Sequence, residues 1–539
     1  MSALDGIVVL GGGHNGLVAA TLLARAGERV LLVERDERLG GTLGTEEIHP
    51  GFRAPLAFAG LERFHPAIAG ELGLERHGLR WLPQRGGTLV LLPGRDALAL
   101  DPAGDLEGAL ARHSPRDAAA LRAFEVERRR LTAALEPLLS APLPRAGARL
   151  RERLSDLLVA GRTWRGLAAA GIETALRLLP MNVRDVLDER FESEPLKAAI
   201  AGPALSSAWM GPRSAGSLWN LWWQRPAWVS HLLAPPRLPA GGPAGLVDAL
   251  ARAAREAGVE IRTGTAVERI LAGPDGVRGV VLEGGVELEA RRVLSALDPR
   301  RTLLELLEPA ALDAETALEV GALRARGNVA IVRLALDRLP RFAGGGAGDG
   351  ALAGRIQIGA TLDELERAYD ASKYAQVAPR PQIEMMVPSI GDPSLAPAGG
   401  AVLHAWVQAV PGPGAARSGS VEDLRAEIAR RVFDSLEEHD PGLTSSVLHA
   451  DVATPADLER RFGITGGCLD HLEPALDQQL WLRPLLGWHL HATPIDGLFL
   501  GGAGAHPGGG PTGLPGRNAA QRVLARGNRP GRETGKTLG

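Results

Sequence analysis

Cysteine is almost absent from this chain, because its 539 residues include a single one, Cys468. A lone thiol excludes an intramolecular disulfide framework and a redox-active C-x-x-C pair. Any electron transfer would therefore need a cofactor, and we interpret Cys468 as a packing residue.

An excess of positive charge is also missing. The formal net charge is -3 at pH 7, which argues against a nucleic-acid partner.

Long apolar runs are missing as well. No stretch of 18 or more apolar residues occurs, so a membrane-spanning helix is not expected. The first strand is predicted to begin at Ile7, which leaves no room for a secretion signal, and we expect a cytoplasmic protein. Arg-spaced apolar helices predicted between residues 150 and 179 leave open a peripheral contact with a membrane surface. A lid packed on its own domain would give the same pattern.

The chain is longer than one hydrophobic core usually supports, so we expect two connected domains. Strand-helix-strand patterns recur near the start, the middle and the end, whereas residues 106–191 are rich in Ala, Leu and Arg and predict helices. We predict an α/β fold in which a discontinuous Rossmann-like domain is interrupted by a substrate domain with a sheet and a helical cap. The predicted dinucleotide-binding segments are 1–76, 237–300 and 487–527, the substrate domain comprises 77–236 and 301–486, and a disordered tail spans 528–539.

A glycine turn follows the first predicted strand and precedes a helix predicted over residues 15–26. Its glycines Gly11, Gly13 and Gly16 match G-x-G-x-x-G, and the strand-turn-helix context is what this motif needs to bind a dinucleotide. The first glycine allows the tight turn, the second lets the pyrophosphate approach, and the third lets the helix pack closely on the strand. Glu34 ends the next strand, where its carboxylate can bind ribose hydroxyls and would repel a 2′-phosphate. The predicted pyrophosphate-binding turn also contains His14 and Asn15.

The stretch that begins at Glu34 narrows the choice of dinucleotide. Its sequence, E-R-D-E-R-L-G-G-T, resembles the E-R/A-x-x-R-x-G-G stretch of flavoproteins of the amine oxidase and phytoene desaturase type. This resemblance implies FAD, with Arg38 reaching the pyrophosphate while Gly40 and Gly41 let the chain pass close to the cofactor. An exposed, charged loop would have a similar composition. The residues that the resemblance assigns to FAD binding here are Arg35, Arg38, Gly40, Gly41 and Thr42.

A third glycine-rich stretch lies near the C-terminus. Residues 501–510, G-G-A-G-A-H-P-G-G-G, resemble the G-A-G-x-H-P-G-G-G signature of the phytoene desaturase, carotenoid isomerase and retinol saturase superfamily. Together with the later G-R-N-A-A, they are most similar to the pyridine nucleotide-disulphide oxidoreductase domain-containing protein 2 subgroup, although one cysteine cannot form a redox dithiol. The resemblance implies that Gly504 and Gly513 contact FAD and that Val267 contacts its adenine. His506 is the candidate catalytic residue, because imidazole exchanges protons near neutral pH, and a structural role in the turn is the alternative.

These resemblances imply an FAD-dependent oxidoreductase that removes hydride from, or isomerises, an unsaturated or lipophilic small molecule, with oxygen or a quinone as electron acceptor. Hydride transfer needs mostly positioning and exclusion of water, so an essential base is not required. A flavin amine or amino-acid oxidase and a non-catalytic carrier of lipids or prenylated proteins are the alternatives. Intact glycines and Glu34 argue against the carrier. Five tryptophans between residues 209 and 228 either line a channel for an apolar substrate or belong to the core.

Overall fold

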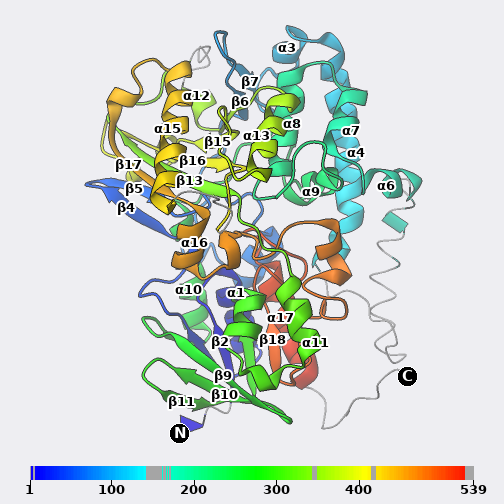
Figure 1. Cartoon of the computed structure of the whole chain (residues 1–539), viewed down its shortest axis with the longest axis vertical. Coiled ribbons are helices and arrows are strands. Elements are labelled where there is room, and N and C mark those ends of the chain that lie inside the picture. Colours follow the sequence, from blue (N-terminus) through cyan, green and yellow to red (C-terminus); the bar gives the residue numbers. More distant parts are fainter. Residues whose placement is uncertain are drawn as a thin grey trace.

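The computed structural model describes residues 2–3, 6–140, 161, 165–166, 168, 172–342, 349–413 and 420–527. Figure 1 shows two stacked parts, with the first strands of the chain and the C-terminal helix in the lower part, and the strands β4 (Thr45–His49) and β5 (Phe52–Pro55) and most of the helices from the middle of the chain in the upper part. The predicted tail, 528–539, lies outside the described residues, as does most of the segment 150–179. The domain limits stay a prediction.

The lower part contains a parallel sheet whose strands come from three separated segments of the chain. Its strand order is β18-β12-β2-β3-β8, and every neighbouring pair is parallel. This arrangement confirms the predicted α/β fold with a discontinuous Rossmann-like sheet. The strands are β2 (Ile7–Leu10), β3 (Val30–Val33), β8 (Glu260–Arg262), β12 (Arg292–Ser295) and β18 (Leu498–Leu500).

Both faces of the parallel sheet are covered, which explains why its strands are continuous apolar runs. Because side chains alternate along a strand, Ile7 and Val9 pack on one side with the helices α1, α10 and α17. Val8 and Leu10 pack on the other side with an antiparallel meander. The helices are α1 (His14–Arg25), α10 (Pro243–Glu256) and α17 (Leu514–Gly527). The meander comprises β9 (Val267–Gly273), β10 (Gly276–Leu282) and β11 (Val286–Glu289). Beside the meander lie β1 (Ser2–Ala3), which pairs with β11, and α11 (Ala314–Ala322).

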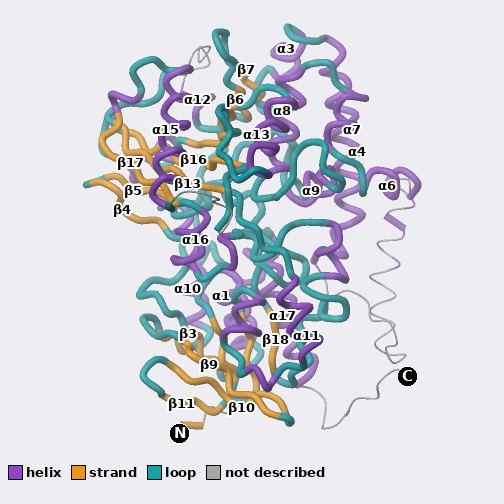
Figure 2. Tube along the Cα trace, in the orientation of Figure 1, coloured by secondary structure: helices purple, strands orange, loops and turns teal. Residues whose placement is uncertain are grey.

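The upper part is built on a seven-stranded mixed sheet with the order β17-β13-β16-β15-β14-β6-β7. Only the β14–β6 pair is parallel among its described pairs. In Figure 2 these strands lie to the left and the helical cap to the right. The strands are β6 (Thr88–Val90), β7 (Leu98–Leu100), β13 (Val329–Leu336), β14 (Arg355–Ile358), β15 (Ile383–Met386), β16 (Ala401–Gln408) and β17 (Val447–Ala453), and a hairpin of β4 (Thr45–His49) and β5 (Phe52–Pro55) packs against them.

The remaining helices pack around both sheets. Trp219, Trp222 and Trp223 are buried on α9, and none of the five clustered tryptophans lines either cavity described below. Trp219, Trp222 and Trp223 therefore belong to the core, whereas Trp209 and Trp228 are half-buried. The helices are α2 (Pro66–Leu72), α3 (Leu106–Ala111), α4 (Pro115–Ser140), α6 (Ile172–Leu178), α7 (Val183–Arg190), α8 (Glu194–Leu205), α9 (Ser217–Gln224), α12 (Asp349–Leu352), α13 (Leu362–Lys373), α14 (Pro388–Gly391), α15 (Val421–His439) and α16 (Pro455–Phe462).

Candidate functional site

The glycine turn joins β2 to α1 at the carboxyl end of the parallel sheet. Gly11 has a φ of 94°, a left-handed conformation that favours glycine, and its N–H donates to the Val33 carbonyl at 2.9 Å. A Cβ on Gly16 would lie 1.9 Å from the Gly11 carbonyl oxygen, so the helix approaches the turn as closely as backbone atoms permit. Gly13 is the N-cap of α1 and provides no side-chain cap. The first N–H groups of α1 are therefore available to an anion.

A cavity opens beside this turn. Most of the residues predicted to bind the dinucleotide line it, although they come from three separated stretches of sequence. The predicted residues that line the cavity are Gly11, Gly13, His14, Asn15, Gly16, Glu34, Arg35, Gly40, Gly41, Thr42 and Val267.

Glu34 lies where the motif predicts a ribose-binding carboxylate. It accepts a hydrogen bond from the Gly12 N–H at 2.7 Å and another from the Asp36 N–H at 3.0 Å. Burial raises the pKa of Glu34, and the two main-chain donors partly oppose that shift. These bonds hold the carboxylate against the turn at the edge of the cavity.

The glycine pair after β3 returns to the same turn. Gly40 has a φ of 117°, its N–H donates to the Gly12 carbonyl at 3.0 Å, and it forms a bridge with Gly13. A Cβ on Gly40 would lie 2.9 Å from Cγ2 of Val247 on α10. Glycine is thus required at position 40 for backbone conformation and for helix packing.

Four residues predicted for the site do not line this cavity. The side chain of Arg38 is exposed. Gly504 approaches Pro299, whose Cδ would lie 2.4 Å from an added Cβ, and Gly513 lies against Phe64 and Ile68. In the described residues these glycines serve close packing, and their predicted contact with FAD receives no support from the cavity lining.

His506 is the fourth of these residues. It is fully buried, and its Nε2 lies 2.8 Å from the carbonyl oxygen of Leu138 on α4. Burial lowers the pKa of His506 to about 3, so the ring is neutral at physiological pH. His506 lines neither cavity, and this position favours the structural alternative.

Other residues line the cavity that the sequence patterns did not single out. Arg301 lies in the short helical turn that comes after β12, and its guanidinium makes no ion pair with any described residue. Asp298 accepts hydrogen bonds from the Arg300 N–H at 2.8 Å and from the Thr465 hydroxyl at 2.9 Å, and burial raises its pKa. A basic residue just beyond the carboxyl end of a parallel strand is the signal that would have identified Arg301.

A second cavity adjoins the first. Phe58 lines both cavities, and Gly510 lines the first while Pro511 lines the second. The lining of the second cavity carries several charged groups, namely Glu62, Arg63, Arg225, Arg355 and Glu384.

The first cavity fits a flavin dinucleotide. A Cβ on Gly13 would meet no atom within 4 Å, so open space lies directly beside the phosphate-binding turn. The buried Nε2 of His14 has no hydrogen-bond partner in the described part of the chain, and burial lowers the pKa of His14 to about 4. Open space, main-chain donors and the unpaired Arg301 are the features that a pyrophosphate requires.

Metal-binding clusters and membrane-spanning helices are both missing from the described residues. These residues contain no group of three or more His, Cys, Asp or Glu side chains that could hold a metal ion. None of their helices is long and apolar enough to cross a membrane. Cys468 is buried in the core cluster below the parallel sheet, and burial raises the pKa of its thiol.

The chain is similar to known flavoproteins over nearly its whole length. The family described as "Flavin containing amine oxidoreductase" matches residues 16–524. Pyridine nucleotide-disulfide oxidoreductase domain-containing protein 2 of Rattus norvegicus is 35% identical, with 96% of this chain and 93% of the relative covered. A limonene dehydrogenase subunit from Castellaniella defragrans is 26% identical, with 96% of this chain and 94% of the relative covered.

The solved structure of cyclohexylamine oxidase from Brevibacterium oxydans shares the fold, with a TM-score of 0.58, 17% identity, and coverage of 97% of this chain and 98% of that chain. These findings confirm the predicted resemblance and the predicted cofactor, FAD. The chain therefore belongs to the flavin-containing amine oxidoreductase family, and it is an FAD-dependent oxidoreductase.

Proposed function

We propose that this protein dehydrogenates a small organic molecule held in the second cavity, by removing a hydride and a proton from adjacent atoms. The observation that carries this proposal is the junction between the two cavities at Phe58 and at the Gly510–Pro511 step. FAD supplies the hydride acceptor when it is bound. A redox-neutral isomerisation would use the same arrangement, with the hydride returned to another carbon of the substrate.

The protein's own contribution begins with positioning and with exclusion of water. Phe58 and Trp406 pack edge to face at the cavity wall, with ring centroids 5.3 Å apart. The Trp406 Nε1–H donates to the Ala57 carbonyl at 2.7 Å, which fixes the indole ring. These rings leave an apolar surface on which the reacting carbons can rest.

The proton that leaves with the hydride needs an acceptor, and Glu62 is the best placed group. Its Oε1 accepts a hydrogen bond from Arg225 at 3.1 Å, while its Oε2 is buried without a partner among the described residues. His404 lines the same cavity, but burial lowers its pKa to about 3. A histidine with so low a pKa is a weak proton acceptor, so we assign this role to Glu62.

The relative from Castellaniella defragrans, which is named as a limonene dehydrogenase, supports dehydrogenation of a carbon skeleton. The expected lipophilic or unsaturated substrate fits the aromatic wall, whereas the charged residues around the second cavity favour a substrate that also carries a polar group. Oxygen or a quinone would restore the cofactor after a net oxidation.

Oxidation of an amine is a second candidate. The aromatic wall formed by Phe58 and Trp406 favours it, because a neutral amine can be held between aromatic rings. The second cavity contains three guanidinium groups, which would repel an ammonium ion. We therefore rank amine oxidation below dehydrogenation.

Anaerobic mixing of the FAD-loaded protein with candidate substrates tests the proposal. A true substrate bleaches the flavin absorbance in a single turnover, and Glu62→Gln should slow that bleaching about 100-fold or more while the flavin content stays unchanged, because a proton acceptor is lost. Bleaching by amines, with peroxide released in air, would favour the second candidate. Equal bleaching rates for Glu62→Gln and the unaltered protein would exclude Glu62 as the proton acceptor.

A further inference from the structure

One face of the seven-stranded sheet forms the floor of the second cavity. Glu384 on β15 is directly opposite Trp406 on β16, and Met386 is opposite His404. Gln357 on β14 is opposite Glu384, and Arg355 lies two residues before it, so both face the same side. Cross-strand pairing thus brings residues from three strands to one surface, and four of them, Arg355, Glu384, Met386 and His404, line the cavity together with Trp406.

Arg355 is the least satisfied of the cations at this surface. Its side chain is 1% exposed, and its Nη2 donates to the Thr88 hydroxyl at 3.0 Å and to the Ala199 carbonyl at 3.2 Å. Its Nε and Nη1 have no hydrogen-bond partner in the described part of the chain. The nearest carboxylate oxygen, Oε2 of Glu384, is 3.9 Å from Nη1, beyond hydrogen-bond distance. Burial lowers the pKa of Arg355 to about 10, so the group is still a cation at neutral pH.

The other two guanidinium groups of the cavity are better paired. Arg225 donates to Oε1 of Glu62 at 3.1 Å and to the Leu232 carbonyl at 3.1 Å. Arg63 donates to Oε1 of Gln224 at 2.8 Å and to the Gly509 carbonyl at 3.0 Å. These bonds fix both groups within the wall of the cavity.

The charges of the cavity do not balance. Among the lining residues, three guanidinium groups, from Arg63, Arg225 and Arg355, face two carboxylates, from Glu62 and Glu384, which leaves a surplus of one positive charge. Behind the lining, Asp470 interacts electrostatically with Arg63 and also with the buried Arg483, so Asp470 and Arg483 add one group of each sign and leave the surplus unchanged. A buried cation with unpaired donors is costly, and an anion that accepts those donors removes the cost. One surplus charge matches a monoanion, whereas a phosphate dianion would leave a negative charge uncompensated.

We propose that the substrate carries a carboxylate, and that Arg355 binds this carboxylate through the unpaired edge of its guanidinium at the floor of the second cavity. The proposal rests on the proposed function, since it assigns the substrate class of the same cavity. It divides the cavity into an aromatic wall for the carbon skeleton and a cationic floor for the acid group. The substrate class is therefore an organic acid with an oxidisable carbon chain, in place of a pure hydrocarbon.

The test measures binding without turnover. The FAD-loaded protein is titrated by calorimetry with hexanoate, hexanamide and hexylamine, which share a chain and differ in charge, and the flavin spectrum is recorded at each step. Hexanoate should bind at least about tenfold more tightly than hexanamide, because a charge-assisted hydrogen bond has roughly that effect on affinity. Hexylamine should bind more weakly than either. Equal affinities for hexanoate and hexanamide, or tightest binding of hexylamine, would overturn the proposal.

Two substitutions with opposite expected effects separate charge recognition from damage to the fold. Arg355→Met should lower the affinity for hexanoate about tenfold or more and leave that for hexanamide unchanged. Glu384→Gln should raise the affinity for hexanoate several-fold, because it removes the carboxylate nearest to Arg355. A merely disruptive change would not strengthen binding, so the gain in Glu384→Gln keeps the test decisive if Arg355→Met fails to fold.

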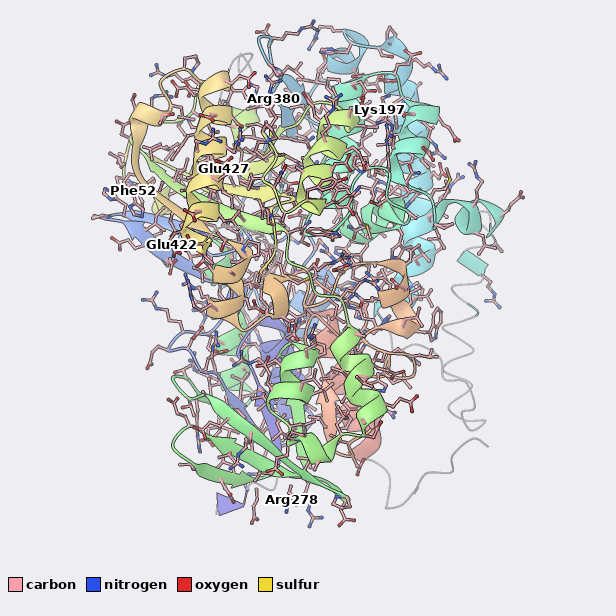
Figure 3. All side chains as sticks on the ribbon, in the orientation of Figure 1. Phe52, Lys197, Arg278, Arg380, Glu422 and Glu427 are labelled. Atoms are coloured by element: carbon pink, nitrogen blue, oxygen red, sulfur yellow. The ribbon has the colours of Figure 1, made fainter. Side chains whose placement is uncertain are left out.

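Arg278→Met is the matched control, because Arg278 is exposed on β10, at the far end of the molecule from the upper sheet (Figure 3). It should leave all three affinities unchanged, and a loss of hexanoate binding in this variant equal to that in Arg355→Met would overturn the proposal.

The test of the carboxylate-binding site can be told apart from the test of the proposed function. Carboxylate binding that depends on Arg355, without bleaching by any acid, would support the binding site and count against dehydrogenation. Bleaching by neutral substrates that is unaffected in Arg355→Met would support dehydrogenation and count against the carboxylate-binding site.

Discussion

Replacing Gly13 with alanine separates binding of the cofactor from stability of the fold. A Cβ at this position would meet no protein atom within 4 Å, and the φ of -71° suits any residue. The added methyl group therefore fits the protein and enters the space beside the turn, where the pyrophosphate must approach. We expect Gly13→Ala to fold normally and to bind FAD poorly.

The expected magnitudes follow from these contacts. Alanine restricts the unfolded chain, which stabilises the fold by about 0.4–1 kcal/mol, and it is a poorer N-cap than glycine by a similar amount. The free energy of unfolding of the apoprotein should therefore change by less than about 1 kcal/mol. Losing one charge-assisted hydrogen bond to the pyrophosphate costs about 1.5–3 kcal/mol, which weakens FAD binding about 10- to 100-fold.

Thermal unfolding of the apoprotein, with and without added FAD, measures both effects. At an FAD concentration about 100 times the dissociation constant of the unaltered protein, bound FAD should stabilise that protein by about 2.7 kcal/mol, and Gly13→Ala by about 0.4–1.4 kcal/mol. Gly70→Ala is the matched control, because its Cβ also meets no atom within 4 Å and Gly70 does not line the cavity. Equal stabilisation of Gly13→Ala and Gly70→Ala by FAD would refute the reasoning.

Three further predictions concern single side chains. Arg301→Met should weaken FAD binding about tenfold, because it removes the unpaired cation of the cavity, whereas Arg38→Met should leave FAD binding unchanged. Titration of the two apoproteins with FAD measures both affinities. Equal losses of affinity would contradict the assignment of Arg301 to the pyrophosphate. His506→Asn should lower the melting temperature, since the contact with the Leu138 carbonyl is lost, and leave flavin reduction intact. Because burial lowers the pKa of His506 from 6.5 to about 3, the unfolded chain binds more protons between these values. Stability should therefore fall as the pH drops below 6.5, by about 1 kcal/mol per pH unit for this residue, and thermal unfolding across pH should show a shallower slope in His506→Asn. Cys468→Ala should retain flavin reduction in single-turnover measurements, because a buried thiol with a raised pKa is not a thiolate, and loss of reduction would count against the packing role.

Local patterns predicted the elements whose burial is uniform or strictly periodic. The apolar run of β2 was predicted to begin at Ile7, where the strand begins in the structure. The helix after the first glycine turn, predicted over residues 15–26, spans His14–Arg25. By contrast, β14 (Arg355–Ile358) was not predicted. It alternates polar and apolar residues but is buried at all four positions, because Arg355 lines a cavity and Gln357 donates to the Ala198 carbonyl of α8 instead of meeting solvent.

In the candidate site, too, the local motifs were predicted from the sequence, whereas contacts between distant segments were not. The glycine turn and Glu34 act through a short strand-turn-helix, so their roles follow from spacing. Arg38 was predicted to reach the pyrophosphate, yet the cations that line the cavity are its neighbour Arg35 and Arg301, and Arg301 lies more than 250 residues further along the chain. The C-terminal glycines marked the family correctly, although Gly504 serves packing against Pro299.

The sequence by itself determined the dinucleotide-binding turn, the two-sided burial of the parallel sheet and the flavoprotein family, because each depends on residues close together in the chain. Only the tertiary structure decided which charges surround the second cavity. Arg63, Gln224, Arg355 and His404 lie far apart in sequence. Their proximity depends on the register of the seven-stranded sheet and on the helices packed against it. Local periodicity predicts whether a residue is buried, whereas its neighbours across a cavity are set by pairing between distant segments.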